Sequence, residues 1–351
     1  MIQRLPQMWK PFCWILVLGL LGPMVTFAEE RDPTFDVVAL GTRGGVVDDN
    51  LTAFMVGERG GTEYVLLDGG TVIDGLTRAL EKGNLTHLSP GKTLHIRPLD
   101  ILRNHVKAVM ISHPHLDHVS GFVMATPGDT EHPIYGLDET LNDLRDHLFN
   151  WVLWPNFTNE GENPLNKYTL QRLSNAGPME PIPDTRLKVQ AFRLSHSKRV
   201  STAFLVEHAN GDSVLFLGDT GPDAAEDSSD LANLWKAVAP RIRAGTLRGL
   251  FLECSYPDPR AENLLFGHLT PIWFMRELNA LAKIVGPAPE GAPSSLAGLP
   301  VVVIGIKPAL LPDGPGDEPE SAAARIRRQL DDANDVGVRL LHPEPGSLFG
   351  L

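Results

Sequence analysis

A dense cluster of metal-binding side chains constrains the fold of this chain most strongly. It is the segment His113-Pro-His115-Leu-Asp117-His118, which directly follows the apolar run at 106–112. Such a run predicts a buried strand. Residues 113 and 115 are two apart, so an extended segment points both imidazoles the same way. We expect the chain to turn into a helix at Asp117 and His118. Four metal-capable groups this close predict a hydrolytic metal site at the end of a strand.

Segments typical of strands alternate with helical segments along the rest of the chain. The expected strands lie at 35–40, 51–56, 64–67, 187–194, 202–208, 213–217, 250–253 and 301–306. Helices are expected at 72–82, from Pro271 onward and at 321–333. Asn210-Gly211 between two of the strands predicts a hairpin. This alternation predicts the α/β class and a single domain, with an inserted region near 127–185.

The first 28 residues have the pattern of a secretory signal peptide. Two cations precede an apolar centre at 14–21, and Thr26-Phe-Ala28 offers small residues for cleavage. The apolar run is shorter than the roughly 20 residues that a membrane-spanning helix needs. We therefore expect cleavage and no stable membrane anchor. The mature domain would comprise residues 29–351 and would be periplasmic or secreted.

The charge of the chain argues against an extended nucleic-acid partner. It contains 31 Lys+Arg and 43 Asp+Glu, a net charge of −12. Loss of the signal segment removes two cations and no acid, which takes the net charge to −14. Binding along a phosphate backbone needs a basic face. A small anionic substrate at one site remains compatible, because bound metal ions make such a site locally positive.

The hexapeptide at 113–118 resembles the metal signature of the metallo-β-lactamase fold superfamily. This resemblance implies an αββα sandwich with further ligands, each following a later strand. His196 follows the expected strand at 187–194, Asp219 follows 213–217, and His268 precedes the helix that begins at Pro271. Six other histidines have no partner at ligand spacing and are expected to be structural or exposed: His87, His95, His105, His132, His208 and His342.

The wider pattern resembles the class II 3′,5′-cyclic-nucleotide phosphodiesterases. Matching segments occur in the expected order at 111–121, 146–150, 154–156, 217–221, 253–256 and 265–271. The block with Phe149-Asn150 and Trp154-Pro155-Asn156 is more family-specific than the histidine core. The resemblance implies hydrolysis of cAMP, with cGMP as a second candidate substrate, to the nucleoside 5′-monophosphate. The nucleophile would be a hydroxide held by two divalent metal ions.

The resemblance also implies how the ligands divide between the two ions. The first ion would take His113, His115 and His196, and the second would take Asp117, His118 and His268. Asp219 has two carboxylate oxygens and would bridge the ions. An imidazole-rich set favours zinc. Asp117 is the predicted catalytic residue, because it could also orient the hydroxide.

The predicted substrate contacts come from the family-specific block. Trp154 could stack on a purine, and Asn150 and Asn156 could form hydrogen bonds with the substrate. The alternative is that the aromatic side chain belongs to the core and that both asparagines cap turns. The sequence alone leaves both interpretations open.

Other residues near the expected strand ends have weaker predicted roles. Asp68 is either a plain turn residue or an acceptor beneath the metal loop. Glu253 and Ser255 lie at a strand end near the expected site. Cys254 is expected to be a small buried apolar residue rather than a nucleophile, because nothing nearby in the sequence offers a paired base.

Two other classes of function compete with the phosphodiesterase. One is a different hydrolase of the same fold: an RNA 3′-processing nuclease, a lactonase or a β-lactamase. The acidic chain disfavours the nuclease, and a complete His/Asp ligand set disfavours the β-lactamase. The other class is a non-catalytic periplasmic metal-binding protein. Turnover that depends on metal would separate the enzymes from the metal-binding protein. The sequence indicates no oligomeric state.

Overall fold

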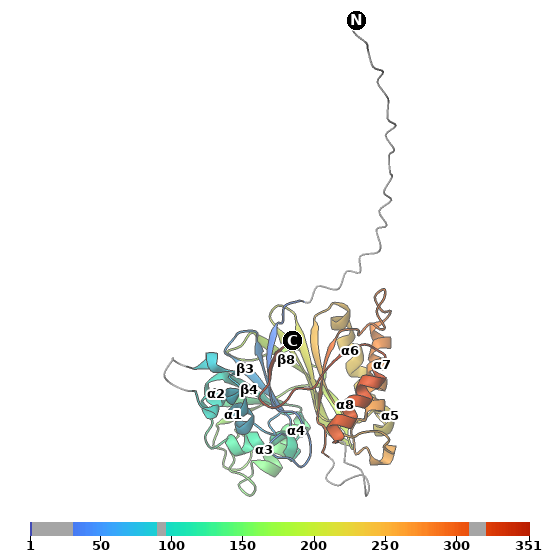
Figure 1. Cartoon of the computed structure of the whole chain (residues 1–351). Helices are drawn as coiled ribbons and strands as arrows, with labels where there is room; N and C mark the ends of the chain where they lie inside the picture. Colours follow the sequence, from blue (N-terminus) through green and yellow to red (C-terminus); the bar gives the residue numbers. More distant parts are fainter. Residues whose placement is uncertain (2–30, 90–95, 309–320) are drawn as a thin grey trace. The chain divides into compact units, whose positions relative to one another are not determined.

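Two seven-stranded sheets form the centre of the structure (Figure 1). The computed structural model describes Met1 and residues 31–89, 96–308 and 321–351. The chain from Pro33 to Leu351 forms one compact unit. The predicted signal segment and His95 lie outside the described residues.

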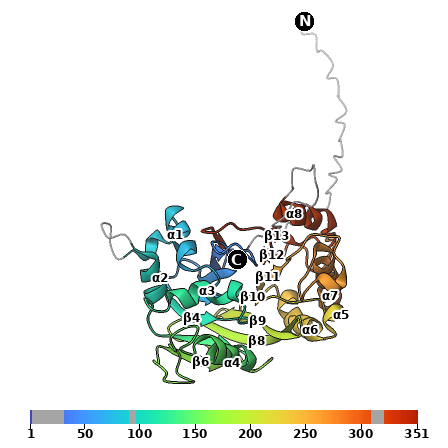
Figure 2. The same ribbon diagram turned by 90° about the horizontal axis from the view of Figure 1, so that it is seen from below.

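The first sheet has the order β14-β1-β2-β3-β4-β5-β6. Its strands are β1 (Phe35–Gly41), β2 (Ala53–Glu58), β3 (Tyr64–Leu67), β4 (Val106–Met110), β5 (His132–Gly136), β6 (Tyr168–Arg172) and β14 (Leu348–Gly350). Its helical segments are α1 (Ile73–Glu81), η1 (Thr86–Leu88), α2 (Pro98–His105), α3 (Leu116–Ala125), α4 (Asp138–Asp143) and the π-helical turn η2 (Leu144–Leu148). Figure 2 shows α1, α2 and α3 together on this side of the unit.

The second sheet has the order β13-β12-β11-β10-β9-β8-β7. Its strands are β7 (Glu180–Pro181), β8 (Leu187–His196), β9 (Arg199–His208), β10 (Ser213–Leu217), β11 (Leu247–Glu253), β12 (Pro300–Ile304) and β13 (Arg339–Leu341). Its helical segments are α5 (Asp223–Glu226), α6 (Asp230–Arg243), η3 (Glu262–Leu264), α7 (Pro271–Val285) and α8 (Ala322–Ala333). Helices α6, α7 and α8 gather on the outer side of this sheet (Figures 1 and 2).

The alternation of side chains along the strands produces four layers. In β1, Val37 belongs to the core between the two sheets, whereas Val38 belongs to the core beneath the helices. In β10, Phe216 faces the inner core and Leu217 faces the outer helices. Successive side chains of a strand point to opposite faces, so a strand that is apolar at every position is buried on both. The predicted αββα sandwich is confirmed.

Most expected elements occur within a few residues of their predicted bounds, and the structure adds others. Gly211 has a positive φ of 92° in the turn between β9 and β10, where the hairpin was predicted. Residues 127–185 extend both sheets, because β5 and β6 continue the first sheet and β7 pairs with β8 in the second. Helices α2 and α6 were not predicted from the sequence.

Candidate metal centre

Six of the seven predicted metal ligands lie close together, and strand ends position several of them. The chain leaves β4 toward His113, β8 ends at His196, and β10 leads to Asp219. The ligand-capable side chains form three overlapping groups, and within each group the ligand atoms lie within 4.8 Å of one another. The groups are His113, His115 and His196; His113, His118 and Asp219; and His196, Asp219 and His268.

The first group contains the three histidines predicted to hold one ion. His113 Nε2 lies 3.0 Å from His115 Nδ1, and His196 Nε2 lies 3.3 Å from the same atom. Burial is the largest influence on all three, and it lowers the pKa of each imidazole. A metal ligand must be a neutral imidazole. A lowered pKa therefore favours the neutral imidazoles that a metal ion requires.

Asp219 lies between the remaining ligands. Its Oδ1 lies 3.3 Å from His118 Nε2, and its Oδ2 lies 3.6 Å from His268 Nδ1. Among the described residues, the buried atoms His118 Nε2 and Asp219 Oδ2 have no hydrogen-bond partner. Buried polar atoms are seldom left without partners. A cation between them would satisfy both atoms, so these residues fit a metal ion.

Asp68 supports His118 from beneath the cluster. It is fully buried directly after β3, and its φ is 54°. Its Oδ2 accepts hydrogen bonds from His118 Nδ1 and from Ser112 Oγ, both at 2.7 Å, and its Oδ1 accepts one from the Ser112 N–H at 2.7 Å. Burial raises the pKa of Asp68 and these donors oppose the rise. A carboxylate on Nδ1 fixes the ring and leaves Nε2 for a metal.

Similar supports hold the histidines on the second sheet. His268 Nδ1 lies 2.8 Å from Glu253 Oε1, and His196 Nδ1 lies 2.8 Å from the Gly267 carbonyl oxygen. Gly267 has a φ of 76°, and a Cβ there would collide with the Ser197 nitrogen. Glycine thus allows this loop to approach His196. Glu253 therefore positions the His268 ring. The sequence alone had left the role of Glu253 open.

Asp117 lies at the margin of the cluster and contacts a residue that sequence reasoning missed. Its Oδ2 accepts a hydrogen bond from the Gly45 N–H at 2.9 Å and lies 3.9 Å from His118 Nε2. Lys307 Nζ lies 3.3 Å from Asp117 Oδ2 and 3.8 Å from Asp219 Oδ2. Burial alone would lower the pKa of Lys307, but these carboxylates raise it. The only sequence signal for Lys307 is its place just after the 301–306 strand.

Lys307→Met is expected to destabilise the metal-free protein more than the zinc-loaded protein. The Lys307 side chain is only 16% exposed, and its charge compensates two carboxylates that metal ions would otherwise compensate. We expect a loss of roughly 1–3 kcal/mol in the metal-free protein, which lowers the Tm by several degrees. Thermal unfolding with and without zinc measures the difference. Equal losses in both states would contradict this role.

The structure places the three predicted substrate contacts in loops rather than at the metal cluster. Asn150 Oδ1 accepts hydrogen bonds from the backbone of Val152 and Leu153, both at 3.0 Å. Trp154 Nε1 donates to Thr126 Oγ1 at 2.9 Å, and its ring packs against the core of the first sheet. Asn156 is fully buried, with both ends of its amide bonded within its own loop. These contacts agree with the turn and core interpretations, and a contact of these three side chains with substrate stays a prediction.

Cys254 and the isolated histidines are placed outside the cluster. Cys254 is fully buried in the outer core of the second sheet, and burial raises the pKa of its thiol. His105 Nδ1 and His87 Nε2 contact backbone carbonyl oxygens, and His132 contacts Asp129. None of these is a member of the described metal groups.

Solved structures identify the class of fold. Unliganded yeast PDE1 superposes with a TM-score of 0.75 at 22% identity, covering 91% of this chain and 100% of that one. The metallo-β-lactamase fold protein YhfI from Bacillus subtilis superposes with a TM-score of 0.54 at 13% identity, covering 91% and 99%. The chain therefore has the metallo-β-lactamase fold.

Sequence relatives identify the family within that fold. The family model of the class II cAMP phosphodiesterases matches residues 37–346. A 3′,5′-cyclic-nucleotide phosphodiesterase of Aliivibrio fischeri is 38% identical, covering 89% of this chain and 92% of that protein. A probable 3′,5′-cyclic-nucleotide phosphodiesterase of Yersinia pestis is 36% identical, covering 95% and 94%. The chain belongs to the class II cAMP phosphodiesterase family, which confirms the resemblance and the predicted enzyme class.

Proposed function

We propose that this chain hydrolyses 3′,5′-cyclic nucleotides, cAMP and also cGMP, to nucleoside 5′-monophosphates at two zinc ions. The observation that carries this proposal is the set of three overlapping ligand groups, two of which share Asp219. A carboxylate common to two groups suits a site with two ions. The surplus of imidazole over carboxylate ligands favours zinc over magnesium.

Different residues of the chain have different roles in the proposed reaction. Divalent ions held here would supply positive charge for the phosphate oxygens and would lower the pKa of water. Asp117, held by the Gly45 N–H and Lys307, presents a carboxylate at the margin of the cluster. In that position it can accept a proton from the attacking water and orient it toward phosphorus. Lys307 adds a fixed positive charge where negative charge accumulates on the phosphate.

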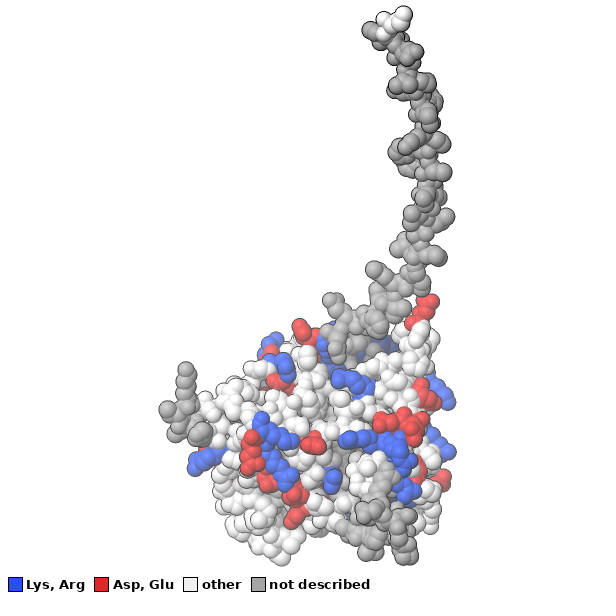
Figure 3. Space-filling view, in the orientation of Figure 1, with Lys and Arg blue, Asp and Glu red and all other residues white. Residues whose placement is uncertain are grey.

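The distribution of charge supports a small substrate over a long polyanion. The net charge of the chain is −12. On the face drawn in Figure 3, Lys and Arg lie among Asp and Glu rather than forming a separate basic surface. An RNA 3′-processing nuclease would need a continuous basic path for its substrate. A cyclic nucleotide carries one charge and needs only the metal cluster.

We also propose that the first 28 residues are a signal peptide and that the mature protein is periplasmic or secreted. The cationic start, the short apolar centre and the small residues at Thr26-Phe-Ala28 support this proposal. In the described part of the chain, no helix combines the length and apolar character needed to cross a membrane. An intact mass equal to that of a chain beginning at Glu29 would support cleavage. A mass that includes residues 1–28 would contradict it.

A screen of cyclic nucleotides tests the proposed activity. Zinc-reconstituted protein is incubated with cAMP and cGMP, and the products are separated by HPLC. We expect 5′-AMP and 5′-GMP, no 3′-monophosphates, and loss of turnover on chelation. Absence of cyclic-nucleotide turnover together with rapid cleavage of a lactam or lactone would replace the proposal with a different hydrolase. Bound metal without any turnover would indicate metal storage.

A further inference from the structure

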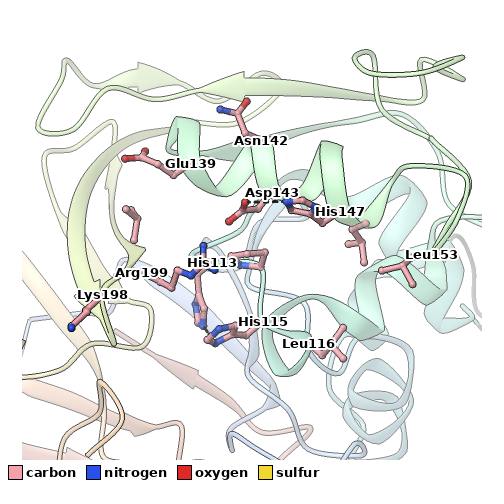
Figure 4. Close-up of a pocket in the computed structure, with 13 residues that line it drawn as sticks. His113, His115, Leu116, Glu139, Asn142, Asp143, His147, Leu153, Lys198 and Arg199 are labelled. Carbon is pink, nitrogen blue, oxygen red and sulfur yellow. Dashed lines mark hydrogen bonds and ion pairs between the residues drawn. The ribbon is translucent and has the colours of Figure 1, made fainter.

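A cavity of about 640 Å³ lies beside the metal centre (Figure 4). His113 and His115 form part of its wall. Small-molecule sites commonly have volumes of about 300–1,000 Å³. The predicted contacts Asn150, Trp154 and Asn156 are not among the residues that line it. A substrate whose phosphate is at the metal centre could extend into this space.

One wall of the cavity is apolar and open to solvent. Leu116 is 68% exposed and Leu153 is 65% exposed, and Leu148 continues the same wall. Exposed leucines that gather at a cavity mark a binding surface more often than isolated ones do. The Asn150 side chain holds the turn that carries Leu153 by accepting the Leu153 N–H. Asn150 therefore shapes this wall without facing it.

Another part of the cavity lining carries a row of polar side chains. Glu139, Asp143 and His147 are spaced four residues apart along α4 and η2, so they lie on one helical face. Figure 4 shows Asp143 directed toward the side of the cavity where His113 lies. Glu139 forms an ion pair with Arg193 at 2.7 Å. Within the described residues, the only side-chain partner of Asp143 is His147 Nε2, at 3.9 Å. The Asp143 carboxylate therefore retains its capacity to accept hydrogen bonds.

The turn between β8 and β9 closes a third side of the cavity. Ser197 and Lys198 have φ values of 51° and 66°, which non-glycine residues adopt at a cost. Glu226 Oε2 braces the turn by accepting hydrogen bonds from the Lys198 N–H and from Ser195 Oγ. The turn thereby connects the predicted ligand His196 with the cationic residues Lys198 and Arg199 at the cavity wall.

We propose that this cavity binds the nucleoside half of the cyclic nucleotide. The base packs against the wall formed by Leu116, Leu148 and Leu153. Asp143 accepts a hydrogen bond from the nucleoside. In cAMP the available donors are the amino group of the base and the ribose 2′-hydroxyl. Apolar surface with a few convergent polar groups is the usual composition of such a site. This inference rests on the proposed function, because it assumes that the phosphate is at the metal centre.

Leu116→Ser and Leu153→Ser test the apolar wall. Each variant is expected to raise the KM for cAMP about tenfold with little change in kcat, because the base would lose part of its apolar contact. Cleavage of methyl p-nitrophenyl phosphate, which has no purine or ribose, is expected to stay unchanged. Leu165→Ser is the matched control, because Leu165 is 50% exposed and does not line the cavity.

Asp143→Ala tests the polar wall with two analogues. Wild-type protein is expected to prefer cAMP over the analogue that lacks the hydrogen-bond donor, either 2′-deoxy-cAMP or purine riboside 3′,5′-cyclic monophosphate. Asp143→Ala is expected to remove that preference, which identifies the donor. If the variant keeps the wild-type preference for cAMP over both analogues, the role of Asp143 is wrong.

The outcomes separate this inference from the proposed function. If wild-type protein cleaves methyl p-nitrophenyl phosphate but not cAMP, the proposed function is wrong, and the nucleoside site is wrong with it. If wild-type protein hydrolyses cAMP and both leucine variants keep its KM, only the nucleoside site is overturned.

Discussion

Asp219→Ala is expected to reduce cAMP turnover by more than about 100-fold and to release at least one equivalent of metal, with the fold intact. Loss of a residue that forms a hydrogen bond with a metal ligand already lowers metal affinity or activity by about 10–100-fold. Asp219 is itself a candidate ligand in two of the three groups. Its carboxylate oxygens also lie 3.3 Å from His118 Nε2, 3.6 Å from His268 Nδ1 and 3.8 Å from Lys307 Nζ. Removing it leaves those positive or metal-binding groups without their common partner.

Turnover, metal content and circular dichroism measured on the same preparation test this prediction. Glu290→Ala provides the control, because it removes an exposed carboxylate outside the described metal groups. We expect the control to keep both its turnover and its metal content. Near-normal turnover of Asp219→Ala would show that the ligand assignment is wrong.

Asp68→Ala is expected to have the second largest effect, on stability as well as on metal binding. It removes the acceptor of three buried hydrogen bonds, which come from the Ser112 N–H, Ser112 Oγ and His118 Nδ1. Breaking a buried charged network by removing one partner costs about 3–5 kcal/mol. The freed His118 ring is also expected to weaken zinc affinity by about 10–100-fold.

Denaturant unfolding and zinc titration measure the two effects of Asp68→Ala separately. Asp68→Asn is the matched variant, because its amide oxygen keeps one acceptor while the negative charge is lost. We expect its free energy of unfolding to lie between that of the wild type and that of Asp68→Ala. A loss below about 1 kcal/mol with unchanged zinc affinity would refute the supporting role of Asp68.

The sequence indicated which candidate ligands lie close together because strand geometry determines much of their arrangement. His113 and His115 follow a strand that is apolar at nearly every position, so their direction follows from the alternation of an extended chain. His196 and Asp219 also follow strands, and strand ends at one edge of a sandwich converge. The sequence therefore indicated which side chains would meet, even though they are distant in the chain.

Side chains that act through tertiary contacts were not predictable in the same way. Lys307 is 190 residues from Asp117 in sequence and carries no motif, so only the packed fold brings them together. The same is true of Glu253, whose role depends on His268 folding back over the end of β11. A local pattern contains no information on such contacts.

The family-specific block shows a second limit of sequence reasoning. Asn150 and Asn156 were predicted to contact the substrate, because their residue types suit hydrogen bonds to it. In the structure their amides satisfy backbone groups of a loop that has a positive φ of 65° at Trp151. Asparagine suits such turns because its side chain substitutes for missing backbone partners. Residue type alone therefore does not distinguish an asparagine that shapes a loop from one that contacts the substrate.

Turnover of cAMP during stepwise addition of zinc to the metal-free protein tests the central claim most directly. Formation of 5′-AMP is followed by HPLC as zinc is added, and bound zinc is counted in the same samples. We expect no turnover without metal and a rate that reaches its plateau at two bound equivalents per chain. A plateau at one equivalent would contradict the two-ion site, and turnover unaffected by metal removal would contradict the account as a whole.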